Sequence, residues 1–221
     1  MKRLLVLLVV ALLAAPTRGE AFPADIPHDI VLPSEGLAVT RDELVCLALN
    51  DYFEARGESM RGRVAVAQVV LNRARDERFP RDICKVVTQN LSGQKFACQF
   101  SWTCDGRSDE PQDLAAWRQS LILAIALTRV TNGISDPTEG SLWYHADSVH
   151  PGWASRLSEV VSIGGHTFYS DPAEKLDASM VAAMDDGSRA YGQAAAIPAP
   201  PPPTFAEWVE MSGVPEQIAQ R

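Results

Sequence analysis

The sequence has 221 residues and a formal net charge of −8, because 28 acidic side chains outnumber 20 basic ones. This charge balance excludes nucleic acid and anionic lipid as expected partners, since both are recognised through clustered lysine and arginine. The length allows one domain with its own hydrophobic core, and the sequence contains no internal repeat.

Residues 1–21 have the organisation of a secretory signal peptide. Two basic residues precede an apolar run over residues 4–15, which is shorter than the ~20 residues of a membrane-spanning helix. Gly19 and Ala21 suit a cleavage site, and Ala15 offers a competing one. Removal of residues 1–21 takes away three basic residues and one acidic residue, which lowers the net charge from −8 to −10. We therefore expect a protein exported to the periplasm or cell envelope without a membrane span, with a retained anchor as the alternative.

Residues 22–39 contain three prolines and little periodicity, and we expect a linker there. The folded unit is predicted to begin at Thr40, because Thr40 and Glu43 have the spacing of a capping box. Apolar residues then follow at close intervals, which predicts a buried helix that ends near Gly57.

Two more helices are predicted further along the chain. Small and β-branched residues between Val64 and Ala74 indicate a helix that packs closely against a neighbour. Apolar residues from about Asp113 to Thr131 indicate another, with Gly133 as its C-cap.

Two segments outside these helices are expected to be less regular. Residues 82–106 combine glycine, polar residues, aromatics and cysteines, which predicts an irregular lobe. Residues 141–170 carry aromatic and turn residues typical of a hairpin or an extended segment. The sequence thus predicts a mainly α (α+β) domain over residues 40–170, with a small irregular or β lobe.

Four cysteines form an even set in a chain predicted to reach an oxidising compartment, which favours two disulfides. They are Cys46, Cys84, Cys98 and Cys104. Three pairings are possible, and the sequence does not choose among them; buried free thiols are the alternative. The spacing matches no zinc module, and we expect neither a metal nor another cofactor.

Residues 171–221 shift in composition toward alanine, acids and proline. Residues 197–203 form a polyproline II spacer that cannot join a packed core. The last segment, from Phe205 to Arg221, is expected to be disordered, with a short docking helix for an envelope partner as the alternative.

Glu54 is the candidate catalytic residue. It lies at the end of an apolar helix, shortly before Gly57, and follows Tyr52 and Phe53. Burial against these aromatic side chains, or against their neighbours in space, would raise the pKa of the carboxyl group toward that of a general acid. A solvated or salt-bridged glutamate is the alternative.

Six motifs occur between residues 44 and 169. They span Leu47 to Glu58, Gly62 to Arg73, Phe79 to Cys84, Cys98 to Gly106, Trp143 to Ala146 and Ile163 to Tyr169. Together these motifs resemble the SleB/CwlJ family of cell wall hydrolases. The resemblance covers residues 44–169. It implies a lysozyme-like helical fold, cleavage of peptidoglycan between N-acetylmuramic acid and N-acetylglucosamine, and Glu54 as the catalytic acid.

The mechanism depends on a second carboxylate, because most glycosidases place two acids across the scissile bond. The candidates are Asp51, Glu58, Asp105, Asp109 and Asp147. Asp51 shares the helix side of Glu54, and Asp105 is typical of a turn. The resemblance favours a lytic transglycosylase, in which Glu54 acts first as acid and then as base toward the muramic acid 6-hydroxyl; muramidase-type hydrolysis is the alternative.

Other residues are predicted to bind substrate or to support the site. The candidate substrate-binding residues are Gln99, Ser101, Trp102, Tyr144 and His145. Trp102 is equally suited to a core position. Arg56 is expected to pair with an acid, and Glu58 to cap the helix beginning near Met60 or to hold its loop.

Two other functions remain open at this stage. A loose group of His145, Asp147, His150 and His166 would suit a metal-dependent amidase or peptidase acting on peptidoglycan, although no fixed ligand spacing is present. A non-catalytic wall-binding protein that recruits partners through its tail is the other alternative.

Overall fold

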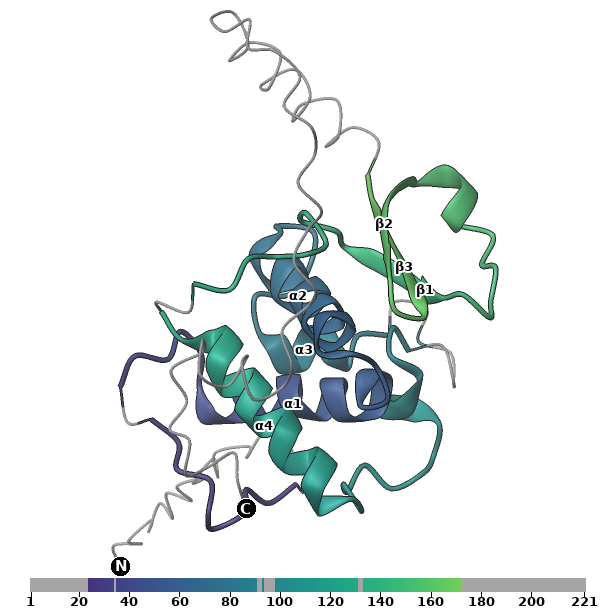
Figure 1. Cartoon of the computed structure of the whole chain (residues 1–221). Helices are drawn as coiled ribbons and strands as arrows, with labels where there is room; N and C mark the ends of the chain where they lie inside the picture. Colours follow the sequence, from purple (N-terminus) through teal and green to yellow (C-terminus); the bar gives the residue numbers. More distant parts are fainter. Residues whose placement is uncertain (1–23, 34, 91–92, 94–97, 131–132, 172–221) are drawn as a thin grey trace, which may run out of the picture.

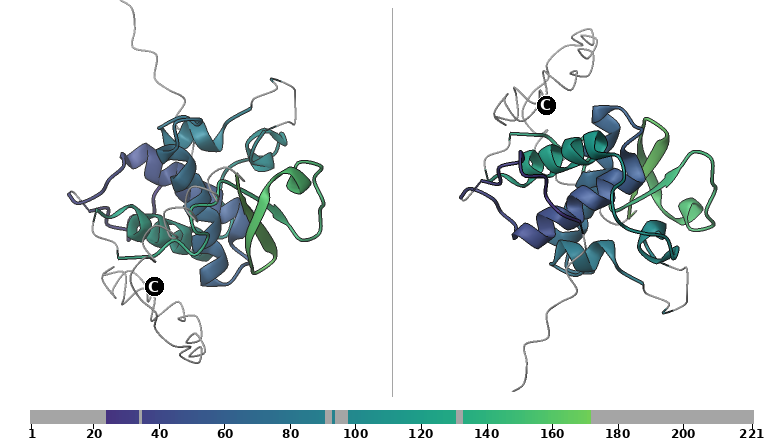
Figure 2. Two further views of the ribbon diagram at one scale, coloured as in Figure 1. Left: turned by 90° about the horizontal axis from the view of Figure 1, so that it is seen from above. Right: turned by 90° about the horizontal axis from the view of Figure 1, so that it is seen from below.

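The computed structural model describes residues 24–33, 35–90, 93, 98–130 and 133–171 (Figure 1). The predicted signal peptide and the tail beyond residue 171 lie outside them. Within the described residues, four α-helices form one layer, and a three-stranded sheet lies at one end of it (Figures 1 and 2). No helix in this part of the chain is long and apolar enough to cross a membrane.

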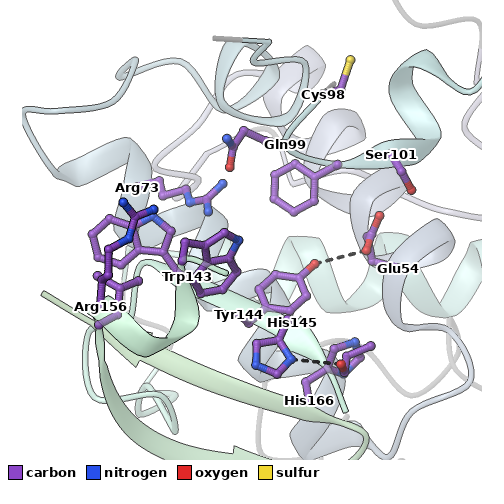
Figure 3. A pocket seen from close by; sticks show the side chains of 14 residues that line it. Glu54, Arg73, Cys98, Gln99, Ser101, Trp143, Tyr144, His145, Arg156 and His166 are labelled. Carbon is purple, nitrogen blue, oxygen red and sulfur yellow. Dashed lines mark hydrogen bonds between the residues drawn. The ribbon is translucent and has the colours of Figure 1, made fainter. Parts of the chain in front are cut away.

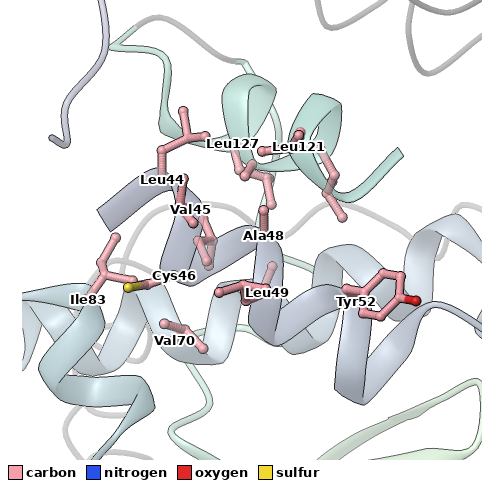
Figure 4. Packing of buried hydrophobic residues seen from close by; sticks show 14 of the residues in the cluster. Leu44, Val45, Cys46, Ala48, Leu49, Tyr52, Val70, Ile83, Leu121 and Leu127 are labelled. Carbon is pink, nitrogen blue, oxygen red and sulfur yellow. The ribbon is translucent and has the colours of Figure 1, made fainter. Parts of the chain in front are cut away.

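Helix α1 (Arg41–Ala55) is the central element of the helical layer. It starts with the predicted capping box, in which the Thr40 hydroxyl accepts from the Glu43 amide at 3.3 Å and the Glu43 carboxylate accepts from the Thr40 amide at 2.9 Å. Every residue from Leu44 to Tyr52 is buried, and their side chains pack against the other helices (Figure 4). Because α1 is packed on all sides from Leu44 to Tyr52, its last turn is held in a fixed position.

Helix α2 (Met60–Arg75) packs against α1, and the short helix α3 (Ile83–Val87) follows it. Helix α3 lies in the segment predicted to be irregular, and the Asp82 carboxylate caps it by accepting from the Lys85 amide at 2.8 Å. The cysteines lie in two pairs at disulfide distance: Cys46 with Cys84 and Cys98 with Cys104. The first pair joins α1 to α3.

Helix α4 (Leu114–Thr128) ends before the predicted Thr131, so the assignment of Gly133 as its C-cap is wrong. The chain becomes extended at Arg129 because it pairs with a segment far away in the sequence. The Thr128 carbonyl accepts from the Ala38 amide at 2.8 Å, and the amide of Val130 donates to the carbonyl of residue 36 at 2.9 Å. Helical periodicity alone does not report such a pairing.

The described part of residues 22–39, expected to be a linker, packs against α4. The Trp117 indole donates to the Asp25 carbonyl at 3.0 Å, and Arg118 forms an ion pair with Asp29 at 2.8 Å. Ile30 is buried in the main core. This segment therefore contributes to the domain instead of only leading into it.

The β lobe consists of β1 (Trp143–Ala146), β2 (Ser158–Ile163) and β3 (His166–Ser170). The order is β1-β3-β2, and both pairings are antiparallel. The central strand β3 is buried throughout, and Phe168 packs against α2 in a second small core. The predicted mainly α fold with a small β lobe is confirmed.

Candidate active site

A cavity of ≈ 640 Å³ lies where the helical layer meets the β lobe (Figure 3). This volume is typical of a ligand-binding cleft. The lining residues come from α1, α2, the segment around the 3₁₀ helix Ser101–Cys104, β1, the 3₁₀ helix Ala154–Arg156 and β3. They are Glu54, Arg73, Cys98, Gln99, Phe100, Ser101, Trp143, Tyr144, His145, Ala146, Trp153, Arg156, Leu157 and His166.

Glu54 projects into this cavity from the last turn of α1. Its carboxyl group is mostly buried, and the resulting desolvation raises its pKa above the ordinary value. A hydrogen bond from Tyr144 lowers the pKa and offsets part of this effect. A carboxyl group in this setting holds its proton to higher pH than a solvated glutamate, as a general acid requires.

Tyr144 on β1 is the direct partner of Glu54. Its hydroxyl donates to Glu54 Oε2 at 3.3 Å (Figure 3). Burial, and next the nearby Glu54 charge, raise the pKa of Tyr144 well above its ordinary value, so the hydroxyl stays protonated. The ring packs against His166 and Phe168, with centroids 5.2 and 5.6 Å away. Tyr144 therefore holds one carboxyl oxygen in place.

The aromatic neighbours expected from the sequence have other roles. The Tyr52 hydroxyl accepts from the amides of Gln112 and Asp113 at 3.1 and 3.0 Å, which anchors the start of α4. Phe53 stacks on Trp102 with ring centroids 4.8 Å apart. Neither Tyr52 nor Phe53 lines the cavity. The aromatic contact of Glu54 comes from Tyr144, its neighbour in space.

Gln99 and Ser101 line the cavity, but Trp102 does not. The Trp102 side chain is buried in the main core, and its indole donates to the side-chain oxygen of Asn50 at 3.2 Å. Of the two positions considered for Trp102, stacking on a sugar ring or packing in the core, the structure has the core position.

His145 lines the cavity with both ring nitrogens engaged. Its Nδ1 lies 3.0 Å from the Ala146 carbonyl, which only accepts, so this nitrogen carries the proton. Its Nε2 lies 2.9 Å from the Tyr169 hydroxyl. Asp147 accepts instead from Thr167 at 3.0 Å. Among the described residues, no three His, Cys, Asp or Glu side chains are grouped so as to hold a metal ion.

The candidate second acids have partners elsewhere. Asp51 is buried in a bidentate ion pair with Arg63. Asp105 accepts from the Arg107 amide at 2.8 Å, as a turn residue does. Asp109 also lies outside the cavity lining. Among the described lining residues, Glu54 is the one carboxylate.

Glu58 holds the turn between β2 and β3. Its Oε2 accepts from the Gly165 amide at 3.2 Å, and its Oε1 lies 3.8 Å from Nδ1 of His166. Gly164 has a φ of +61°, and a Cβ atom there would lie only 2.1 Å from Glu58 Oε2, so glycine suits this turn and leaves room for the Glu58 carboxylate. Ser59, not Glu58, caps α2. Glu58 thus binds the turn between β2 and β3, and this contact joins the helical layer to the β lobe.

Arg56 forms no ion pair among the described residues, contrary to the expectation. Its guanidinium donates to the Tyr52 carbonyl at 3.1 Å and lies 4.5 Å from the centroid of the Tyr52 ring. It therefore folds back on the last turn of α1 and adds a side-chain donor to the Tyr52 carbonyl.

Substrate binding was not predicted for five of the lining residues, of which the sequence singled out His166 only as a member of the loose group of possible metal ligands. The five are Arg73, Trp143, Trp153, Arg156 and His166. One signal could have identified Arg73: it is a charged residue at a position that continues the buried face of α2. Burial lowers the pKa of Arg73 to about 10, which still leaves it positively charged near neutral pH. Trp143 and His166 lie on the paired strands β1 and β3, and Trp153 and Arg156 lie on the segment that connects β1 to β2.

Curated relatives share a sequence segment with this chain. A spore cortex-lytic enzyme of Oceanobacillus iheyensis is 32% identical over 130 residues, which cover 58% of this chain and 42% of that protein. The spore cortex-lytic enzyme of Bacillus subtilis is 31% identical over 131 residues, which cover 58% of this chain and 38% of that protein. The chain thus spans less than half the length of these relatives.

Solved structures with a similar chain include the catalytic domain of the Bacillus cereus SleB protein, with 26% identity and a TM-score of 0.46. That match covers 63% of this chain and 95% of the solved one. The catalytic domain of the germination-specific lytic transglycosylase SleB from Bacillus anthracis matches with 25% identity and a TM-score of 0.46, covering 60% of this chain and 98% of that one.

A family model described as cell wall hydrolase matches residues 57–169, which is about half of the chain. The match begins three residues after Glu54 and includes every other residue that lines the cavity. The chain belongs to the cell wall hydrolase family.

Proposed function

We propose that this protein cleaves the glycan strands of peptidoglycan between N-acetylmuramic acid and N-acetylglucosamine, with Glu54 as the catalytic residue. Family membership and relatives named spore cortex-lytic enzymes support this substrate class. The observation that carries the proposal is a single carboxyl group with a raised pKa in a large cavity. A protonated acid beside a cleft is what cleavage of a glycosidic bond needs first.

In the first step, Glu54 gives its proton to the glycosidic oxygen, and the bond from that oxygen to C1 of the muramic residue breaks. The N-acetylglucosamine side leaves as an alcohol, and positive charge develops at C1 and the ring oxygen. Glu54 is now a carboxylate and stabilises that charge. Tyr144 continues to donate to one carboxylate oxygen, which keeps the other directed at the sugar.

In the second step, Glu54 acts as base toward the 6-hydroxyl of the same muramic residue. The hydroxyl oxygen bonds to C1, and its proton returns to Glu54, so the product is a 1,6-anhydro sugar and no water is consumed. This route uses one carboxyl group, in agreement with a lining that offers one among the described residues. We therefore favour a lytic transglycosylase over a muramidase, which would use a water molecule held by a second group.

The remaining lining residues supply the walls of the substrate site. Trp143 and Trp153 present aromatic surface of the kind that packs against sugar rings, and Gln99 and Ser101 carry groups that can bind an acetamido group. We further propose that the protein is exported through its N-terminal signal and acts in the periplasm or cell envelope, where peptidoglycan lies. The tail beyond residue 171 would recruit an envelope partner.

Digestion of purified sacculi followed by mass spectrometry of the soluble fragments tests this function. The wild type should release fragments with anhydro-muramic ends, and Glu54→Gln should reduce release by at least about 100-fold, because proton transfer contributes that much in comparable enzymes. Glu110→Gln, at an exposed site, is the matched control.

Other products decide between the alternatives. Reducing muramic ends would replace transglycosylation by hydrolysis, and freed stem peptides from an active Glu54→Gln variant would indicate an amidase. Binding to sacculi without any release would leave a wall-binding protein.

A further inference from the structure

Arg73 is a buried arginine that the proposed reaction does not use. It is 4% exposed, yet its side chain lines the active-site cavity. Its Nε donates to the Leu142 carbonyl at 2.7 Å, which fixes the guanidinium, whereas its Nη1 is buried and has no hydrogen-bond partner among the described residues. Leaving a charged donor unsatisfied is costly, so a buried guanidinium that lines a cavity and has an unpaired nitrogen suits a ligand that carries an acceptor.

A second arginine lies on the same cavity. Arg156 ends the short 3₁₀ helix between β1 and β2, is exposed, and forms no ion pair within the described part of the chain. Figure 3 shows Arg73 and Arg156 on the same side of the group of lining side chains, away from Glu54. A ligand that fills the cavity can therefore meet both arginines while its other end lies at the acid.

The other titratable groups of the lining add little negative charge. Glu54 is the one carboxyl group among the described lining residues, and burial favours its neutral form. Burial also lowers the pKa of His166, which favours a neutral ring despite Glu58 and Asp147 nearby. Tyr144 stays protonated. The described lining thus carries two arginines and one carboxyl group, in a chain whose formal net charge is −8.

We propose that Arg73 and Arg156 form a subsite for a carboxylate carried by the muramic residue of the substrate. This inference rests on the proposed function and names the part of the substrate that the cavity selects. Arginine donors suit carboxylates because the guanidinium offers several N–H groups in a plane. The carboxylate has two sources: the lactyl group of a peptide-free muramic residue, or the stem peptide where the lactyl group is amide-linked.

The test compares glycan strands that differ only in charge. Peptide-free strands and strands with intact stem peptides are each prepared as free carboxylates and as methylamides, formed with carbodiimide and methylamine. The wild type should cleave at least one charged substrate with a kcat/KM about tenfold higher than its neutral counterpart, the size expected for a charged hydrogen bond. The pair that shows the difference identifies the source of the carboxylate.

Variants assign the preference to these arginines. Arg156→Gln, at an exposed position, should lose most of the preference for charged strands, mainly through a higher KM on those strands. Arg73→Met should lose it too, and its thermal unfolding is measured first because Leu142 loses a donor. Arg61→Gln removes an exposed charge on the same helix α2 as Arg73 and should keep the preference.

Two results would overturn the proposal while leaving the function intact. One is equal cleavage of charged and neutral strands of both kinds by the wild type. The other is a preference that neither Arg156→Gln nor a folded Arg73→Met reduces. Failure of the wild type to cut any strand would instead remove the proposed function.

Discussion

The helical layer and the β lobe contribute to the cavity in different ways. The helical layer supplies Glu54 from α1, whose position depends on a core packed on every side. The β lobe supplies Tyr144 and His166 from strands that touch the helices through the small Phe168 core and the Glu58 contact. The acid is thus held by a helix packed in the main core, and the groups that tune it lie on the small β lobe. This division separates changes that unfold the domain from changes that adjust its activity.

The largest effect is expected in the helical layer, for Asp51→Asn. This change removes the carboxylate that pairs with Arg63 and leaves the arginine charge buried without compensation. It should lower the free energy of unfolding by about 3–5 kcal/mol. Chemical denaturation measures the loss. The double variant Asp51→Leu with Arg63→Met removes both charges and should recover most of the stability. A loss below about 1 kcal/mol for Asp51→Asn would show that the two regions do not differ in this way.

A smaller effect is expected at the contact between the two regions. Gly164→Ala adds a Cβ at a φ of +61° and only 2.1 Å from Glu58 Oε2, so the turn is strained and the Glu58 carboxylate must swing aside, which breaks its hydrogen bond to the Gly165 amide. We expect a loss of about 2 kcal/mol in stability, together with a severalfold loss of glycan cleavage.

Gly140→Ala is the matched control for this change. It has the same strain, at a φ of +83°, with nothing near its Cβ, and should lose about 1 kcal/mol without a loss of specific activity. Equal effects of the two substitutions on activity would show that the Glu58 contact does not position the β lobe.

Within the β lobe, Tyr144→Phe should change the pH dependence of cleavage more than the stability. The Tyr144 hydrogen bond lowers the pKa of Glu54, so its loss should raise that pKa further. The alkaline limb of the kcat/KM profile, where the acid loses its proton, should then move to higher pH.

Tyr169→Phe is the control for the pH profile, because it removes a hydroxyl of the same sheet that binds His145 and not Glu54. Its alkaline limb should stay in place. A shift toward lower pH in Tyr144→Phe would contradict the role of this hydroxyl.

The smallest effect concerns the stability cost of Glu54 itself. Because its folded-state pKa is raised above the ordinary 4.5, the folded protein binds the proton more tightly than the unfolded chain does. The free energy of unfolding therefore falls as pH rises from 4.5 through the higher pKa of the folded state, because Glu54 must then ionise in a buried position. Glu54→Gln should be slightly more stable than the wild type at pH 7 and equal to it below pH 4.5, as denaturation at both pH values would show. A variant less stable at pH 7 would contradict the buried setting of the acid.

Local patterns were sufficient to predict much of the helical layer. The capping box at Thr40 and the apolar run after it are properties of adjacent residues, so the start of α1 and the place of Glu54 could be predicted. The end of α4 could not, because Arg129 pairs with Leu37 across most of the domain. A residue's own neighbours carry no information about such a contact.

The same limit applies to the site. Trp102 and Tyr144 both occur in motifs rich in aromatic residues. Trp102 is nevertheless buried in the core, where its indole donates to Asn50, whereas the Tyr144 hydroxyl donates to Glu54 in the cavity. Arg73 and Arg156 are separated by most of the domain in sequence and line one cavity in the folded domain. An acidic composition gave no sign of two arginines in one cavity, since charge counts do not report where charges gather.

The burial of α1 from Leu44 to Tyr52 also bears on how the proposed activity would be lost on heating. A carboxyl group on a loop can lose its position while the rest of a domain is still intact, whereas Glu54 is carried by the last turn of α1, directly after this buried run and before the buried Ala55. We therefore expect Glu54 to keep its position until the core around α1 unfolds. Residual activity during a temperature ramp should follow the fraction of folded molecules, without an earlier inactive but folded phase.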